Sequence, residues 1–256
     1  MFEDLIEYYE QEYNEDERLK KDKSHSVEFL TSVKYFNKTL KKGSKVLDAC
    51  AGTGIYSFYL AKKGCQVTAG DMVDYNVSII KEKQLETPLL NEVYTGSVLD
   101  LSRFEDDSFD AVLCMGALYH IKDEYTRKKA IKECLRVLKS EGIFVASYIN
   151  KYAVILHNCE DELSNMAELL QYYKESYQGI FYGSSPKEII DVMENEGLKT
   201  LHNIATDGSS YLVNSKLNNS SSENFNKWLQ LHFESCEEES LLGYSLHALY
   251  FGVKKY

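Results

Sequence analysis

The chain has 256 residues, 44% of them hydrophobic, and a formal net charge of -11 at pH 7. A chain of this size and composition can bury a full core, as one domain or as one domain with a large insertion, which excludes disorder as the default. The negative net charge disfavours binding to the phosphate backbone of a nucleic acid, which proteins usually bind with clustered Lys and Arg. Nucleic acid is therefore disfavoured as a partner.

The sequence also argues against a membrane or a metal. No stretch approaches the roughly 18 to 20 uninterrupted apolar residues of a membrane span, and the opening MFEDLIEYYE lacks the basic start and apolar run of a signal peptide. We expect a cytoplasmic protein without membrane contact, either a monomer or a homodimer. The six cysteines show no C-x-x-C spacing, so we expect reduced core thiols and no metal site.

Residues 1–40 are predicted to form a helical arm or cap. Residues 3–23 are polar and charged with interleaved tyrosines, which indicates a helix or an ordered arm rather than core. Apolar residues then recur at near-helical spacing between Val27 and Leu40, and Gly43 follows where a helix C-cap belongs. This second helix leads the chain into its main domain.

From residue 41 onward, short apolar strands alternate with helical segments. The expected strands are KVLDA (45–49), QVTAGD (66–71), EVYTGS (92–97), FDAVLCMG (109–116) and IFVASYI (143–149). Strands of this kind separated by helical crossovers predict a parallel sheet with helices on both faces. The fold class is therefore a doubly wound α/β fold.

Residues 151–182 interrupt this alternation. They are helical in period and rich in Tyr and acidic residues, so we expect a helical lid insertion above the sheet. A capping box in 185–188 restarts the pattern, and KTLHNIATDG and SLHALYFGVKK are expected as two closing strands, with a polar loop at 213–224 between them. Residues 41–256 thus form one domain with seven strands.

The stretch KVLDACAGTG raises the question of what binds at its glycines. Gly52 and Gly54 follow the first strand of the alternating region, at the edge where open parallel sheets bind ligands. A dinucleotide-binding turn needs a third glycine at the position of Ser57. Asp48 precedes the turn, and its charge repels a pyrophosphate but suits a ligand with a cationic amine.

Asp71 ends the next strand, where a carboxylate can accept both hydrogen bonds of a ribose diol. One amine, one ribose and no pyrophosphate describe S-adenosylmethionine. From Lys45 to Ile149 the chain resembles the class I S-adenosylmethionine-dependent methyltransferases, whose sheet ends in an antiparallel strand. The motifs that carry the resemblance are VLDACAGTG, AGD, GSVLDLSRFEDDSFDAVL, GALYHI and ECLRVLKSEGIFVAS.

The resemblance implies roles for the residues of the first two motifs. Asp48 would face the amine of the methionyl group, and Gly52 and Gly54 would admit the cofactor. Asp71 would bind the ribose hydroxyls. Each of these residues has a structural alternative, since glycines shape turns and carboxylates cap helices.

The later motifs imply the remaining contacts. Ser97 and Val98 would border the adenine, and Cys114 and Met115 would border the methionyl group, mostly through backbone atoms. The chain departs from the family in two places. Cys50 stands where the first glycine of the turn is usual, and Ser97 stands where an acid often meets the adenine amine.

Two residues of LYHI are candidates for catalysis. His120 is placed to face the transferred methyl group, and an imidazole can take a proton near neutral pH. The alternative is that His120 holds the loop by hydrogen bonds, and that Tyr119 packs rather than lines the pocket. Tyr9, Tyr13 and Arg18 would form a lid over the cofactor, or else a solvated helix face.

These inferences lead to methyl transfer from S-adenosylmethionine to an N, O, S or C nucleophile. The predicted lid favours a small-molecule acceptor. One alternative is a tRNA or protein methyltransferase, which needs a basic or open groove beside the cofactor. Another is a non-catalytic module that binds S-adenosylmethionine without transferring its methyl group.

Overall fold

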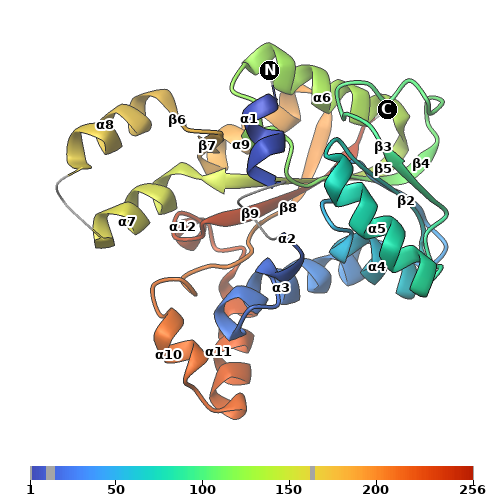
Figure 1. Cartoon of the computed structure of the whole chain (residues 1–256). Helices are drawn as coiled ribbons and strands as arrows, with labels where there is room; N and C mark the ends of the chain where they lie inside the picture. Colours follow the sequence, from blue (N-terminus) through green and yellow to red (C-terminus); the bar gives the residue numbers. More distant parts are fainter. Residues whose placement is uncertain (1, 10–14, 162–164, 256) are drawn as a thin grey trace.

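The computed structural model describes residues 2–9, 15–161 and 165–255. Its centre is a nine-stranded sheet within these residues (Figure 1). The strands are β1 (Lys45–Asp48), β2 (Gln66–Asp71), β3 (Glu92–Thr95), β4 (Phe109–Cys114), β5 (Leu138–Asn150), β6 (Tyr177–Gln178), β7 (Phe181–Ser184), β8 (Leu198–Ala205) and β9 (His247–Lys254).

Seven of these strands run in the order β3-β2-β1-β4-β5-β9-β8. The first five are parallel, and β9 is antiparallel to both β5 and β8. The predicted doubly wound, mostly parallel sheet with an antiparallel last strand is confirmed. The hairpin β6–β7, which joins the end of β5 through β7, was not predicted, because its strands are too short to show a period of two.

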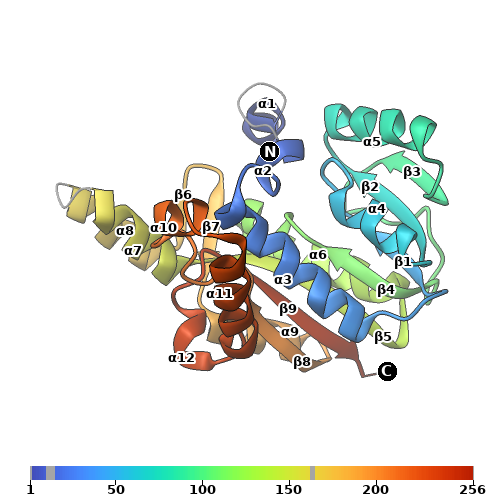
Figure 2. The same ribbon diagram turned by 90° about the horizontal axis from the view of Figure 1, so that it is seen from below.

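Helices cover both faces of the sheet (Figures 1 and 2). On one face, α3 (Lys23–Thr39), α4 (Ile55–Lys62) and α5 (Asp74–Glu86) bury Phe36, Leu60 and Ile80 against it. On the other face, α6 (Glu124–Val137) and α9 (Pro186–Asn195) bury Ile131 and Met193. Because successive strand residues point to opposite faces, β1, β4 and β5 each contribute residues to the apolar cluster on the α3 face and to the one on the α6 face. Each buried Leu or Ile contributes about 1.5–3 kcal/mol.

One strand position shows how tightly this core is packed. Gly70 of β2 lies under the ring of Tyr94 on β3, and a Cβ atom at Gly70 would lie 2.1 Å from that ring. Val93 and Tyr94 pair with Ala69 and Gly70 in the parallel register of the two strands. The strand end that carries Asp71 is therefore held by a side chain of the neighbouring strand.

The N-terminal residues form α1 (Glu3–Glu7) and α2 (Glu15–Arg18) before α3. Tyr35 and Phe36 of α3 belong to the same apolar cluster as the sheet. The division into an arm at 1–40 and a domain at 41–256 stays a prediction, and the structure adds that α3 packs as part of the domain core.

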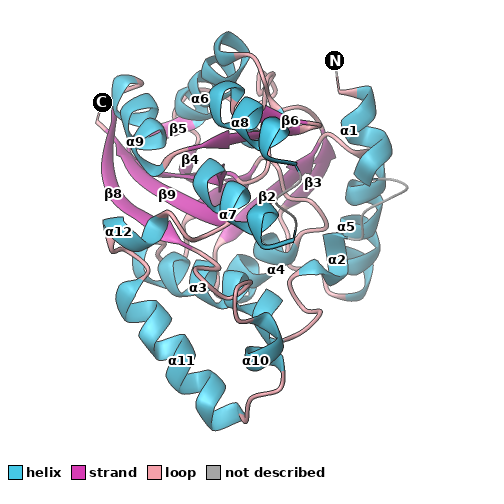
Figure 3. Ribbon diagram, turned by 90° about the vertical axis from the view of Figure 1, so that its left-hand side faces the viewer, coloured by secondary structure: helices cyan, strands magenta, loops and turns pink. Residues whose placement is uncertain are grey.

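The insertion at 151–182 contains α7 (Lys151–Asp161), α8 (Met166–Glu175) and the strand β6 with the start of β7. The two helices project from the end of β5, away from the rest of the molecule (Figures 1 and 2), and lie in front of the sheet in Figure 3. Tyr152, Leu170 and Tyr173 are exposed on them. Their role as a lid stays a prediction.

Three further helices lie between β8 and β9, namely α10 (Asn214–Asn218), α11 (Ser222–Ser235) and α12 (Glu239–Leu242). Part of the stretch predicted as a polar loop is thus helical, because Leu217 is buried with Val27 of α3 and Phe225 of α11. Among the described helices, none is long and apolar enough to cross a bilayer.

Candidate active site

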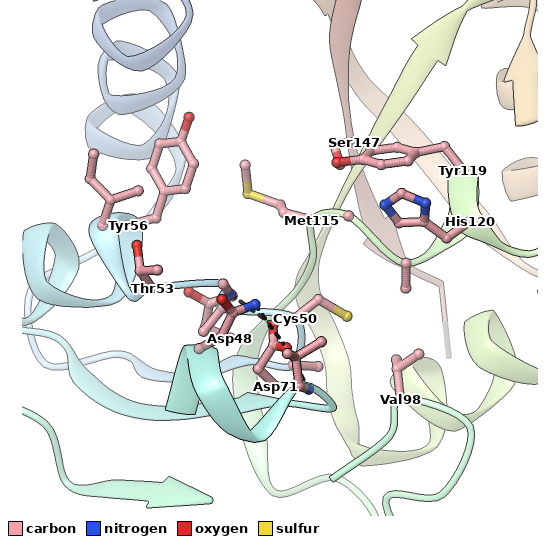
Figure 4. Close-up of a pocket in the computed structure, with 18 of the residues that line it drawn as sticks. Asp48, Cys50, Thr53, Tyr56, Asp71, Val98, Met115, Tyr119, His120 and Ser147 are labelled. Atoms are coloured by element: carbon pink, nitrogen blue, oxygen red, sulfur yellow. Dashed lines mark hydrogen bonds between the residues drawn. The ribbon is translucent and has the colours of Figure 1, made fainter. Parts of the chain in front are cut away.

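A pocket lies at the carboxyl ends of β1, β2, β4 and β5, the edge at which open parallel sheets bind ligands (Figure 4). Met115 lies between Tyr56 on one side and Tyr119 with His120 on the other (Figure 4). The predicted residues that line this pocket are Tyr9, Arg18, Asp48, Gly52, Asp71, Val98, Met115, Tyr119 and His120. Tyr13 lies outside the described residues.

The glycine turn joins the ends of the first two strands. Gly52 and Gly54 have φ of 53° and 86°, in the left-handed region that glycine adopts without strain. The Gly52 N–H donates to Oδ2 of Asp71 at 2.8 Å. Gly54 is the N-cap of α4 and contacts Ile80 and Phe58 instead of lining the pocket. Gly54 therefore shapes the turn and leaves the lining to Gly52.

Asp48 is a buried carboxyl group at the end of β1, with 2% of its surface exposed. Its Oδ2 accepts a hydrogen bond from the Ser57 hydroxyl at 2.6 Å. Burial raises the pKa of Asp48 to about 7, the Ser57 hydrogen bond opposes this, and the charge of Asp71 adds to it. A carboxylate in this state is stabilised by a cationic group placed beside it.

Ser57 is a site residue that sequence reasoning missed. Its position was interpreted as a missing third glycine, and its fully buried side chain instead orients Asp48 from the first turn of α4. The sequence did offer a signal: Ser57 has a hydroxyl group in the first helical turn after the glycine pair, within reach of Asp48 at the end of β1.

Asp71 is held in place by three donors. Oδ1 accepts from the Val73 N–H at 2.9 Å and the Asn76 side chain at 3.3 Å, and Oδ2 accepts from Gly52. Burial raises the pKa of Asp71, although these hydrogen bonds oppose the rise. Each carboxylate oxygen has two acceptor positions, so Oδ2 keeps one position for a ribose hydroxyl. Asn76 was not predicted from the sequence.

Two of the predicted contacts involve residues outside the pocket lining and stay predictions. Val98 lines the pocket, but Ser97 does not, and its hydroxyl accepts the Leu99 N–H at 3.2 Å in a local turn. Met115 lines the pocket, whereas Cys114 is fully buried in the core on the α6 side of the sheet. Cys114 misses the pocket because successive residues of a strand face opposite sides.

His120 is bonded through both ring nitrogens. Nδ1 lies 3.0 Å from the carbonyl oxygen of Ile180, and Nε2 lies 3.1 Å from the Tyr9 hydroxyl. A carbonyl can only accept, so Nδ1 carries the proton and Nε2 accepts from Tyr9. Burial lowers the pKa of His120 to about 4. The ring is therefore neutral at pH 7, which favours the alternative of a residue that holds the loop.

An aromatic cluster of Tyr8, Tyr9, Tyr119, His120 and Phe181 covers this side of the pocket. The Tyr8 and Phe181 ring centroids are 6.1 Å apart, and Phe181 lies 5.1 Å from His120. The aromatic cluster thus joins Tyr8 and Tyr9, which follow α1, to Phe181 at the start of β7. None of the residues that line the pocket comes from the described parts of α7 or α8.

A charge network of Arg18, Glu28, Asp207 and His247 reaches the same pocket, and Arg18, Glu28 and His247 line it. The two terminal nitrogens of Arg18 bind the Glu28 carboxylate at 2.5 and 2.9 Å. His247 Nδ1 lies 2.8 Å from Asp207 Oδ2 and 3.5 Å from Glu28 Oε2. Burial alone would raise the pKa of Glu28, but Arg18 and His247 hold it at about 2.

Carboxylate and imidazole atoms of three of these residues lie within 4.8 Å of one another, close enough to hold a cation. Arg18 already occupies both Glu28 oxygens, so we interpret the group as a network of ion pairs. Arg18 was predicted to reach the cofactor, and this stays a prediction; the pair with Glu28 uses two of the five N–H donors of the guanidinium. The network was not foreseen, because residues on α2, on α3 and near the C-terminus meet only in the fold.

The strand order, the glycine turn and the acid at the end of β2 define the fold of the class I S-adenosylmethionine-dependent methyltransferases. Residues 47–146 of the chain match the family described as "Methyltransferase domain". The cofactor of the class is S-adenosylmethionine. The residues present fit it, since Asp48 suits a cationic amine and Asp71 Oδ2 keeps an acceptor position for a ribose hydroxyl.

Relatives and solved structures agree with this assignment. A ubiquinone biosynthesis O-methyltransferase of Xanthomonas oryzae pv. oryzae is 36% identical over 109 residues, 43% of this chain and 44% of the relative. One from Xanthomonas axonopodis pv. citri is 30% identical over 157 residues, 61% of this chain and 63% of the relative. The chain thus spans less than half of the first of these relatives and under two thirds of the second.

Among solved structures, a complex of the Trm112 methyltransferase activator with a methyltransferase of Haloferax volcanii matches with a TM-score of 0.64 and 19% identity, over 98% of both chains. A possible histamine N-methyltransferase of Thermotoga maritima matches with a TM-score of 0.57 and 16% identity, over 100% of both chains. At these identities the likeness shows the fold.

Proposed function

We propose that the protein transfers a methyl group from S-adenosylmethionine to an oxygen atom of a small-molecule acceptor. The observation that carries this proposal is one pocket lined by two kinds of residue. The first is the buried pair Asp48 and Asp71, and the second is the charged set Arg18, Glu28 and His247 together with the apolar residues Met115 and Leu249. The name of the relatives, O-methyltransferase, favours oxygen over nitrogen, sulfur or carbon.

In this proposal the residues hold the cofactor by charge and by acceptor geometry. Asp48 pairs with the cationic amine of the methionyl group, and Asp71 Oδ2 accepts from a ribose hydroxyl. Gly52 admits the ligand to the backbone, and Val98 packs on the adenine. The bound cofactor supplies a methyl group that its positive sulfur already activates. The protein then mainly aligns the partners and excludes water, and alignment alone contributes roughly 7–11 kcal/mol.

The cover over the pocket supports a small acceptor. Leu5 and Tyr9 line the pocket, and ring contacts join Tyr8 and His120 to Phe181 of β7. A macromolecular acceptor needs an open groove at this place. The rival assignment, a tRNA or protein methyltransferase, predicts RNA binding that weakens steeply with salt or transfer to a protein, and filter binding with a salt titration tests its RNA branch.

The fold alone does not decide the reaction. A protein described as the [4+2]-cyclase SpnF shares the fold, with a TM-score of 0.56 and 17% identity. A module that binds the cofactor without methyl transfer is therefore the second rival. Binding and turnover must be measured separately to distinguish the two.

Calorimetric titration with S-adenosylmethionine and S-adenosylhomocysteine tests the site, and mass spectrometry of a panel of phenols, alcohols, amines and thiols tests transfer. We expect micromolar binding of both ligands and methylation of an oxygen acceptor. Asp71→Asn should weaken both ligands at least about tenfold. Asp110→Asn is the matched control, because Asp110 pairs with Lys139 near the opposite end of β4. Binding without any transfer would contradict the proposal.

A further inference from the structure

His247 and Asp207 form a carboxylate–imidazole pair in the wall of the pocket. His247 begins β9, and Asp207 follows β8, its antiparallel neighbour. His247 Nδ1 lies 2.8 Å from Asp207 Oδ2. The carboxylate is itself fixed, since it accepts from the Ser245 hydroxyl at 2.5 Å and from the His247 N–H at 3.2 Å. A carboxylate held in this way orients an imidazole ring and selects its tautomer.

The pair leaves one ring nitrogen for a ligand. An ionised carboxylate only accepts, so Nδ1 is the protonated nitrogen and Nε2 of the neutral ring has its lone pair free. Within the described residues, Nε2 has no hydrogen-bond partner, and 35% of the side chain is exposed in a residue that lines the pocket. This differs from His120, whose Nε2 already accepts from Tyr9.

A second polar atom lies in the same wall. Ser147 of β5 pairs with Leu249 of β9, so Ser147 and His247 stand on one face of the sheet as diagonal neighbours. The Ser147 hydroxyl is buried and has no hydrogen-bond partner in the described structure, and the residue lines the pocket (Figure 4). An orphaned buried hydroxyl is costly unless a ligand pairs with it.

The charged groups around His247 come from every element packed on it. Glu28 of α3 lies 3.5 Å from Nδ1, Asp207 lies beyond β8, and Arg18 of α2 binds Glu28. Burial would lower the pKa of His247, but Glu28 and Asp207 raise it above its usual value, with Arg18 opposing them. A base that titrates near the working pH is the most effective kind.

We propose that His247, oriented by Asp207, is the general base that deprotonates a phenolic hydroxyl acceptor, and that Ser147 hydrogen-bonds the acceptor. This rests on the proposed methyl transfer to oxygen. The phenol gives its proton to His247 Nε2, and its oxygen forms a bond to the methyl carbon while the carbon–sulfur bond breaks and its electrons stay on sulfur. The proton then leaves His247 for solvent. A phenol suits this base, because its pKa is about 10, as in tyrosine.

The test compares the full-length protein with His247→Gln, using a series of phenols of decreasing pKa. We expect unchanged binding of S-adenosylhomocysteine and a kcat lower by about 10²–10⁴-fold with the least acidic phenols. The loss should shrink for nitrophenols, which are already ionised, and added imidazole should restore part of the rate. His202→Gln is the matched control, since His202 pairs with Glu237 and does not line the pocket.

Asp207 acts through His247 as a positioning residue, so its test uses the pH profile. The rate with the unaltered protein should rise with pH through the pKa of His247. In Asp207→Asn this limb should move to lower pH, and NMR titration of the ring should show the same fall in the pKa of His247. A ring signal that does not move in Asp207→Asn, or that does not respond to a bound phenol, overturns the proposal.

The outcomes separate the two levels of inference. No transfer by the unaltered protein contradicts the proposed function, and the base assignment fails with it. Transfer with an equal rate and pH profile in His247→Gln overturns the base assignment alone. Should His247→Gln fail to fold, as judged by circular dichroism, the NMR titration of the unaltered protein with and without a phenol decides.

Discussion

Ser57 donates its hydroxyl hydrogen to Oδ2 of Asp48 across 2.6 Å, in a place where neither side chain is more than 2% exposed. The hydrogen bond stabilises the ionised form of a carboxyl group that burial would otherwise keep protonated, and the pKa of Asp48 settles at about 7. The cofactor end of the pocket is thus poised between a charged and a neutral state near the working pH.

Asp48→Asn should therefore stabilise the free protein, and more so at high pH. The pKa of Asp48 is about 7 in the fold and 3.8 in an exposed peptide, so folding favours the protonated form. The cost of the charge is absent below about pH 4, grows as pH rises and is complete above pH 7, at up to about 4 kcal/mol. Urea unfolding at pH 5 and pH 8 measures this, and an equal effect at both values would contradict it.

Ser57→Ala should raise the pKa of Asp48 further and weaken the cofactor in a pH-dependent manner. More of the carboxyl group is then protonated at pH 7, so we expect a loss of affinity for S-adenosylmethionine of about tenfold, recovered near pH 9. Calorimetry at the two pH values checks this. The control is Ser78→Ala, since Ser78 of α5 bonds only a nearby carbonyl on the surface. A pH-independent loss would mean that Ser57 acts by packing.

His120 should make stability depend on pH in the opposite direction. Its pKa is about 4 in the fold and 6.5 in an exposed peptide, so the unfolded chain binds the proton more readily. Stability is then fully present above pH 6.5 and is lost as pH falls toward 4, by up to about 3 kcal/mol. In His120→Asn this part of the slope should vanish, and His25→Asn, at an exposed position, should leave it. Unfolding curves between pH 4 and 7.5 provide the measurement.

Gly70→Ala should destabilise the sheet beside Asp71. The added methyl group meets the Tyr94 ring, which has an atom only 2.1 Å from where the Cβ atom would lie, and such overpacking typically costs about 1–3 kcal/mol. Gly243→Ala is the matched control, because nothing lies within 4 Å of a Cβ atom there. Thermal unfolding compares the two, and equal melting temperatures would show that Tyr94 moves aside freely.

The features that the sequence predicted well depend on local patterns. The alternation of short apolar strands with helical periods predicted the sheet, and the glycine pair after β1 located its ligand edge. Asp48 and Asp71 could be placed together because parallel strands bring their carboxyl ends to one edge. These inferences need no knowledge of distant contacts.

The features that were missed depend on contacts between distant segments. His120 was a candidate base because it was placed to face the transferred methyl group, and its partners, Tyr9 and the carbonyl of Ile180, come from distant segments. The relation of His247 to Asp207 and Glu28 was not predicted, because it depends on how β8, β9 and α3 pack. In both cases the partners lie far apart in the sequence, so no local sequence motif indicates the contact.

The hydrogen bond between Tyr9 and His120 also bears on the order of events in a catalytic cycle. Leu5 and Tyr9 line the pocket, and this bond ties the N-terminal segment to the loop that carries His120. Movement of the segment away from the pocket would break this bond and the ring contact between Tyr8 and Phe181. A segment held in this way would admit the partners while it is open and exclude water while it is closed.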